Sequence, residues 1–201
     1  MSYGKTAVDW QQRLDFDKLR KDRVERTNNL LKKYGVGAVA CFGWDNGRYL
    51  SALFNHPYGR HLPSHMVLLV RDAGFPYVFV MHMDEQRLKE YAPWLRDRLI
   101  FERGMLTPRV YRMMPSDMAA KEWGEAANQI TSLMKKNEVA DLPLAIDWTG
   151  INTVEAFQKA GLKLMDGNAL MQEARMVKSD EEIELMRQAA VCNENGYAQL
   201  V

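Results

Sequence analysis

The run HMVLLVRDAGFPYVFVMH (65–82) indicates the fold class of this 201-residue chain. It contains two short apolar segments, HMVLLV (65–70) and YVFVMH (77–82), separated by the turn-rich sequence RDAGFP. Apolar segments of this length, bounded by glycine and proline, are typical of buried strands, and the connection suits a hairpin. The run therefore predicts two neighbouring antiparallel strands.

Further strands and helices alternate on both sides of this hairpin. The predicted strands are GAVACF (37–42), RYLSAL (48–53), LIFE (99–102), LAIDW (144–148) and LKLMD (162–166). The predicted helices cover 12–34, 84–98, 115–136, 149–160 and 168–175, with Pro93 weakening the middle of the second one. This alternation predicts an α/β domain with a mixed sheet flanked by helices.

The segment MVKSDEEIELMRQAAVCNENGYAQLV (176–201) has a sharp helix start. Ser179 precedes Glu182 by three residues, which is the spacing of a capping box. One face of the predicted helix is apolar and calls for a partner surface; it carries Ile183, Met186, Ala190, Tyr197 and Val201. We expect an α/β domain over 12–174, then a junction and the first helix of a further unit over 175–201. The alternative is a terminal helix that packs on its own domain.

Composition excludes several broad classes of protein. Hydrophobic residues make up 47% of the chain, which disfavours disorder. The longest apolar runs are far shorter than the ~20 residues that a bilayer requires, so no membrane partner is expected. Two cysteines, Cys41 and Cys192, cannot build the disulfide framework of a secreted domain, and the first residues lack the apolar stretch of a signal peptide. We therefore expect a cytoplasmic setting.

The net charge of +1 conceals an asymmetry between the two halves of the chain. Residues 1–112 carry 19 basic and 12 acidic side chains, or +7, and residues 113–201 carry 8 and 14, or −6. The halves could face each other or a second subunit, or the basic half could face an anionic partner. We expect no nucleic-acid partner, because acidic residues interleave the basic ones and no aromatic–basic motif appears.

The polar loop FNHPYGRHLPSH (54–65) is the strongest candidate for a binding site. His56, His61 and His65 could ligate zinc in a self-contained enzyme, although their spacing matches no compact metal motif. Arg60 with His61 could instead bind an anion or a carboxylate, because arginine offers a bidentate donor. The third interpretation is an exposed loop with solvated histidines.

Two motifs give the chain a resemblance to the creatinase/prolidase family, which includes Xaa-Pro aminopeptidases. Asn46–Ser51 fits the family's N-x-x-Y-L-[ST] pattern, read here as a strand, and Arg175–Ile183 fits its R-x-[IV]-K-S-x-x-E-[IL] junction. An arginine-rich first helix that ends in glycine adds to the likeness, which covers about residues 15–201. The stretch GVGAVACF…RYL also resembles dimethylsulfoniopropionate lyases of the same superfamily.

The resemblance implies an N-terminal domain that precedes a pita-bread catalytic domain, of which this sequence holds only the first helix. The family's divalent metal pair would lie in that second domain, so no catalytic residue, metal ligand or cofactor is expected here. The resemblance also implies a homodimer in which a loop reaches the partner's active site. By its location, the 54–65 loop is expected to contact a peptide or small-molecule substrate through Tyr58, Arg60 and His61. The alternative is a stand-alone binding or interaction module with the same fold.

Overall fold

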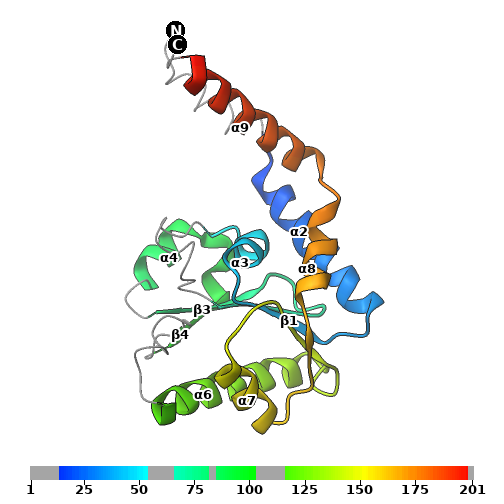
Figure 1. The fold of residues 1–201 in the computed structure, drawn as a ribbon, viewed down its shortest axis with the longest axis vertical. Coiled ribbons are helices and arrows are strands. Elements are labelled where there is room, and N and C mark those ends of the chain that lie inside the picture. Colours follow the sequence, from blue (N-terminus) through cyan, green and yellow to red (C-terminus); the bar gives the residue numbers. More distant parts are fainter. Residues whose placement is uncertain (1–13, 54–65, 82–84, 103–115, 199–201) are drawn as a thin grey trace.

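The computed structural model describes residues 14–53, 66–81, 85–102 and 116–198 (Figure 1). Its strands are β1 (Ala38–Cys41), β2 (Met66–Val70), β3 (Tyr77–Met81), β4 (Leu99–Glu102), β5 (Leu144–Ile146) and β6 (Leu164–Asp166). Its helices are α2 (Phe16–Lys33), α3 (Trp44–Ser51), α4 (Glu85–Tyr91), the 3-10 helix η3 (Pro93–Arg98), α6 (Ser116–Lys136), α7 (Ile151–Lys159), α8 (Asn168–Met176) and α9 (Asp180–Ala198). No helix in these ranges is long and apolar enough to cross a membrane.

The strands form one mixed sheet in the order β4-β3-β2-β1-β5-β6. The hairpin predicted from the sequence is confirmed, because β2 pairs antiparallel with β3, and β1 pairs antiparallel with β2. The outer strands β4, β5 and β6 each pair in parallel with their neighbours. Parallel neighbours need crossover connections, and α7 supplies one between β5 and β6. The predicted α/β class with a mixed sheet is therefore confirmed.

Helices cover both faces of the sheet (Figure 1). Successive strand residues point to opposite faces, so Ala38 and Ala40 pack toward α6 and α7, whereas Val39 and Cys41 pack toward α2, α3 and α8. On the first face, Trp123 of α6 lies edge-on to the Phe42 and Phe157 rings, with centroids 5.6 and 6.1 Å away. The core thus consists of two apolar layers, one on each face of the sheet.

The predicted strand over 48–53 is wrong, because residues 48–51 belong to α3, which ends at Ser51. Asn46 and Leu50, four residues apart, are both buried on one side of the helix. The preceding GWDNG sequence (43–47), although it is rich in turn-forming residues, lies mostly within the same helix. The reason is tertiary: the backbone N–H of Gly43, just before the helix, donates to the distant carboxylate of Asp147 at 3.1 Å. Local sequence does not reveal this contact.

The predicted helix over 84–98 is divided near Pro93. α4 ends at Tyr91, and the 3-10 helix η3 begins with Pro93 itself. Proline has no N–H to continue an α-helical ladder, but it is tolerated at the first position of a new helix. The remaining predicted helices and strands are present, and the predicted ends that fall on described residues shift by at most two residues. The predicted ends at 12, 65, 82 and 115 lie outside the described residues.

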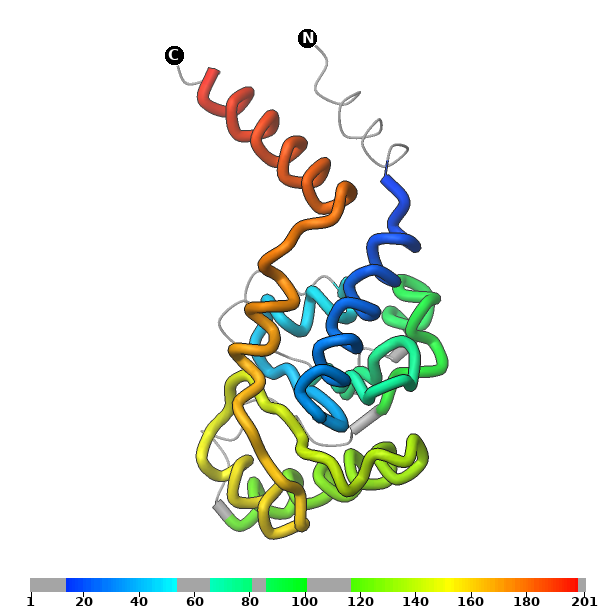
Figure 2. The backbone as a smooth tube through the Cα atoms, turned by 90° about the vertical axis from the view of Figure 1, so that its right-hand side faces the viewer, coloured from blue at the N-terminus to red at the C-terminus, as the bar shows by residue number. Residues whose placement is uncertain are grey.

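Helix α9 extends away from the rest of the described chain (Figures 1 and 2). Helices α2 and α8 lie side by side below it (Figure 2), so α9 starts where this pair ends. Glu182 is the one buried residue of α9. The exact division predicted at 174/175 stays a prediction; α8 itself continues to Met176.

Candidate functional site

The loop residues predicted to bind substrate lie outside the described residues. Tyr58, Arg60 and His61 belong to 54–65, so their role stays a prediction. The two sequence motifs, 46–51 and 175–183, lie entirely within the described residues, and they define the candidate site.

The two motifs contact each other directly. The side-chain Oδ1 of Asn46 in α3 accepts a hydrogen bond from Nη1 of Arg175 in α8, at 2.9 Å. The Tyr49 hydroxyl, also in α3, donates to the backbone oxygen of Ala174 at 2.8 Å, in a buried position. The prediction of a strand over 48–53 did not indicate this contact between the motifs. Only a helix turns both Asn46 and Tyr49 to the side that faces α8.

Asp147 anchors the start of α3 on the sheet. Its carboxylate follows β5 and accepts from the backbone N–H of Phe42 at 2.7 Å and from Nδ2 of Asn46 at 2.9 Å. The N–H groups of Gly43 and Trp148 also donate to it, at 3.1 and 2.6 Å. Burial raises the pKa of Asp147, although these four donors oppose the shift by favouring the ionised form. A helix start at the end of a parallel strand is a common anion site, and here the chain fills it with its own carboxylate.

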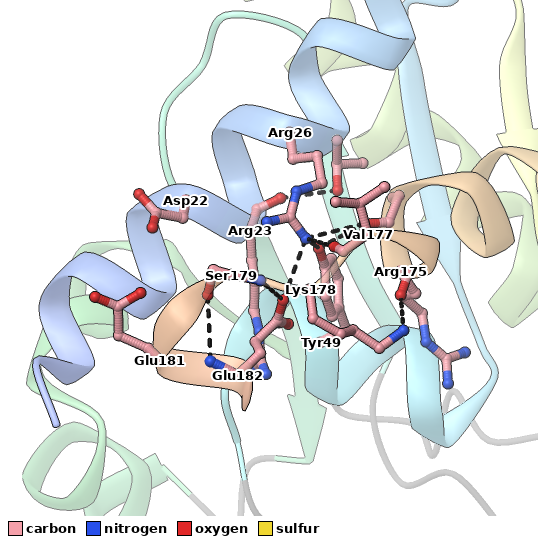
Figure 3. A network of polar contacts seen from close by, with 12 residues as sticks. Asp22, Arg23, Arg26, Tyr49, Arg175, Val177, Lys178, Ser179, Glu181 and Glu182 are labelled. Carbon is pink, nitrogen blue, oxygen red and sulfur yellow. Dashed lines mark hydrogen bonds and ion pairs between the residues drawn. The ribbon is translucent and has the colours of Figure 1, made fainter. Parts of the chain in front are cut away.

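The capping box predicted at the start of α9 is confirmed (Figure 3). The N–H of Ser179 donates to Oε2 of Glu182 at 3.0 Å, and the N–H of Glu182 donates to the Ser179 hydroxyl at 3.3 Å. This reciprocal pair satisfies two of the backbone donors that a helix start leaves open. The junction between α8 and α9 is further held by Lys178, whose ammonium donates to the Arg175 carbonyl.

Two arginines of α2 bind the same Glu182 carboxylate. Nε of Arg23 lies 2.8 Å from Oε1, and Nη1 of Arg26 lies 3.2 Å from Oε2. Burial alone would raise the pKa of Glu182, but the Ser179 N–H and the two guanidinium groups outweigh it and lower this pKa. We call Arg23, Arg26, Ser179 and Glu182 the arginine clamp.

Arg26 also connects the clamp to its surroundings (Figure 3). Its Nη1 lies within hydrogen-bond distance of the Tyr49 hydroxyl at 3.0 Å, the Val177 carbonyl at 2.6 Å and the Ala174 carbonyl at 3.3 Å. One guanidinium therefore joins α2, α3, the end of α8, the linker and α9. Sequence reasoning missed this group because the basic residues of α2 sit in a mixed charged run that is typical of a solvated face.

The charge asymmetry of the sequence reappears as ion pairs between the two halves. Besides the clamp, Lys18 lies 2.9 Å from the Glu181 carboxylate, and Lys33 lies 2.8 Å from that of Glu173. Of the alternatives left open by the sequence, these contacts support the one in which the basic and acidic halves face each other.

The chemistry of the described site is positioning. Its charged side chains bind one another, and Cys41 behind it is fully buried, with a thiol pKa raised by burial. In the described ranges, no group of three His, Cys, Asp or Glu side chains is arranged to hold a metal ion. The arrangement fixes the relation of α2, α3, α8 and the first turn of α9.

Comparison with known proteins places this geometry in context. No protein-family model matches the chain. The dimethylsulfoniopropionate lyase DddP of Roseobacter denitrificans is 26% identical over 183 residues, which are 88% of this chain and 38% of that protein. DddP of Roseovarius nubinhibens is 23% identical and matches 100% of this chain and 43% of its own length.

Solved structures identify the fold. An Xaa-Pro aminopeptidase chain from Streptococcus pyogenes matches over 80% of this chain and 100% of its own length, with TM-score 0.56 and 12% identity. The N-terminal domain of the peptidase PepQ from Mycobacterium tuberculosis matches over 76% and 98%, with TM-score 0.50 and 15% identity. The chain has the creatinase/prolidase N-terminal fold. A dipeptidase from Pyrococcus horikoshii matches over 89% of this chain but 43% of its own, with TM-score 0.59 and 15% identity.

The chain spans about two fifths of the length of the two curated relatives it matches. The resemblance proposed from the sequence motifs is thus confirmed at the level of the fold.

Proposed function

We propose that this chain acts as the non-catalytic N-terminal domain of a metal-dependent hydrolase or lyase related to Xaa-Pro peptidases. The creatinase/prolidase N-terminal fold and the match to two fifths of the DddP lyases support this proposal. A divalent metal pair would then be held by residues beyond those of this chain. The role of the described residues is to hold the junction from which such a catalytic part would begin.

The exposed face of α9 is the observation that carries the proposal. Met186 and Tyr197 are 59% and 73% exposed, and Ile183 on the same face is 38% exposed. A helix whose apolar residues face solvent is typical of a surface that another unit covers. Because the clamp holds the first turn of α9 on α2, this face starts from a fixed place at the end of the domain.

Dimerisation and substrate gating form the finer part of the proposal. In the assembled enzyme, the 54–65 loop of one subunit would contact the substrate at its partner's active site through Tyr58, Arg60 and His61. Arginine and histidine are suited to a substrate carboxylate or another anion. Substitution of Arg60 by alanine in the full-length enzyme should raise KM more than it lowers kcat.

A truncation separates this proposal from the stand-alone alternative. A chain that ends at Lys178 should still fold cooperatively, because α9 buries little besides Glu182. The loss of stability should not exceed the about 1–2 kcal/mol that a partly exposed ion-pair cluster contributes. In the stand-alone module, residues 179–201 would pack on their own domain or a twin, and the truncation would unfold or strongly destabilise the chain. Urea denaturation of the two chains distinguishes these outcomes.

A further inference from the structure

We propose that the arginine clamp is a positioning device that sets the direction in which α9 leaves the domain. This inference concerns only the helices of this chain. It does not depend on the proposed function, and either one can fail while the other stands.

In the described ranges, α9 is joined to α2 through ion pairs at its first turn. Glu182, which is 6% exposed, is its one buried residue among those described. The neighbouring Glu181 pairs with Lys18; the Glu181 side chain is 15% exposed, but that of Lys18 is 51% exposed, and a pair with an exposed partner constrains little. Among the described residues, the Glu182 carboxylate is therefore the most buried group that could set the direction of α9.

The clamp relates Glu182 to three other elements at once (Figure 3). Arg23 and Arg26, one turn apart on α2, bind the two carboxylate oxygens separately. The Arg23 guanidinium also lies over the Tyr49 ring, 4.9 Å from its centroid, and Arg26 contacts the Tyr49 hydroxyl. Both arginines are thus held by α3 as well as by α2. Two separate oxygen contacts restrict rotation of α9, which a single contact would permit.

Removing the carboxylate would leave a site with a defined chemistry. In Glu182→Ala, two guanidinium groups and the Ser179 N–H would still face the place of the lost oxygens. These donors suit a small carboxylate such as acetate. Acetate bound there would not be joined to α9, so it should neutralise the two arginines without restoring the direction of the helix.

The native cysteines make the direction of α9 measurable. Cys192 is exposed on α9, and Cys41 is buried in β1, so a thiol-reactive spin label should attach selectively to Cys192. A second label attaches at the exposed position 25 of α2 in Glu25→Cys. Pulsed electron spin resonance then reports the distribution of distances between α2 and α9.

We expect a narrow distribution in doubly labelled Glu25→Cys, which becomes about twofold broader when Glu182→Ala is added to it. Saturating acetate should leave the distribution broad, because the acetate is not joined to α9. The matched control adds Glu181→Ala to Glu25→Cys; it removes the adjacent acid and its pair with the half-exposed Lys18 and should leave the width unchanged. Circular dichroism establishes that each chain is folded, and the isosteric Glu182→Gln replaces the alanine variant if that one does not fold.

Three results would overturn the inference. The first is a distribution that is already broad in the parent, and the second is one that stays narrow in Glu182→Ala or Glu182→Gln. The third is a distribution that acetate returns to the width of the Glu25→Cys parent, which would mean that the charge on the arginines, and not the link to α9, governs the direction.

Discussion

Replacing Asp147 with alanine removes the carboxylate on which four hydrogen-bond donors converge. Two of the donors come from buried residues: the backbone N–H of Phe42, which is 1% exposed, and the side-chain amide of Asn46, which is 6% exposed. The other two are the N–H groups of Gly43 and Trp148, in residues that reach solvent. The substitution thus leaves two donors without an acceptor in a place that water does not readily enter.

The cost follows from these two donors. An unsatisfied buried donor costs about 1–3 kcal/mol, which gives about 2–6 kcal/mol for the pair. Alanine also avoids the cost of burying a charged carboxylate, which is the cause of the raised pKa of Asp147. The net loss in the free energy of unfolding should therefore be near 3 kcal/mol, or about 6–12 °C in Tm for a chain of this size. Because the folded-state pKa lies above the ordinary 3.8, the parent gains stability as pH falls through the folded-state value toward 3.8. The difference in unfolding free energy between the parent and Asp147→Ala should therefore widen in mild acid.

Urea denaturation followed by circular dichroism, from neutral pH to about pH 4, measures both quantities. The matched control is Asp141→Ala, which removes an exposed aspartate shortly before β5 and should change stability by less than about 0.5 kcal/mol. A loss for Asp147→Ala no larger than that of the control would refute the reasoning. So would a difference that closes in acid, because it would give the pKa shift the opposite sign.

Three further predictions concern other parts of the structure. Glu182→Gln should lower the free energy of unfolding by about 1–2 kcal/mol near neutral pH. Because the folded-state pKa of Glu182 is lowered, this difference should close as the pH falls below the ordinary glutamate pKa of 4.5. Denaturation at stepped pH tests this, and a difference that widens in acid would contradict it. Gly37→Ala should destabilise the fold by about 1–3 kcal/mol, since its new Cβ would lie 2.7 Å from a backbone oxygen. Gly124→Ala, in open space within α6, should instead stabilise the fold by up to about 1 kcal/mol. Equal melting temperatures for the two variants would contradict this packing. An alkylating reagent should modify Cys192 in the folded chain and Cys41 only after unfolding, so mass spectrometry should find one adduct without denaturant and two with it. Rapid modification of both cysteines in the folded chain would contradict the buried position of Cys41.

The sequence predicts those parts of the fold whose signals are local. The strands β2 (66–70) and β3 (77–81) are apolar runs bounded by turn residues, and the start of α9 is a capping box within four residues. Each of these features is determined by side chains close together in the chain, so the pattern alone suffices. The same holds for Pro93, whose missing N–H marks the division between α4 and η3.

The features that depend on distant residues were missed. Helix α3 begins beside Asp147, and the Asn46–Asp147 contact joins positions 101 residues apart. The clamp likewise joins Arg23 of α2 to Glu182 across 159 residues. Its sequence signal was a pair of arginines one turn apart, in a run that otherwise resembles a solvated helix face. The 46–51 and 175–183 motifs were found, but only the fold reveals that they contact each other.

The intact mass of the protein purified from its native source tests the central proposal most directly. As one domain of a longer hydrolase or lyase, the protein should have a mass of about twice the 23.2 kDa of this chain or more. A native mass equal to that of the chain alone would contradict the proposal. The search for function would then turn to a partner for the exposed face of α9.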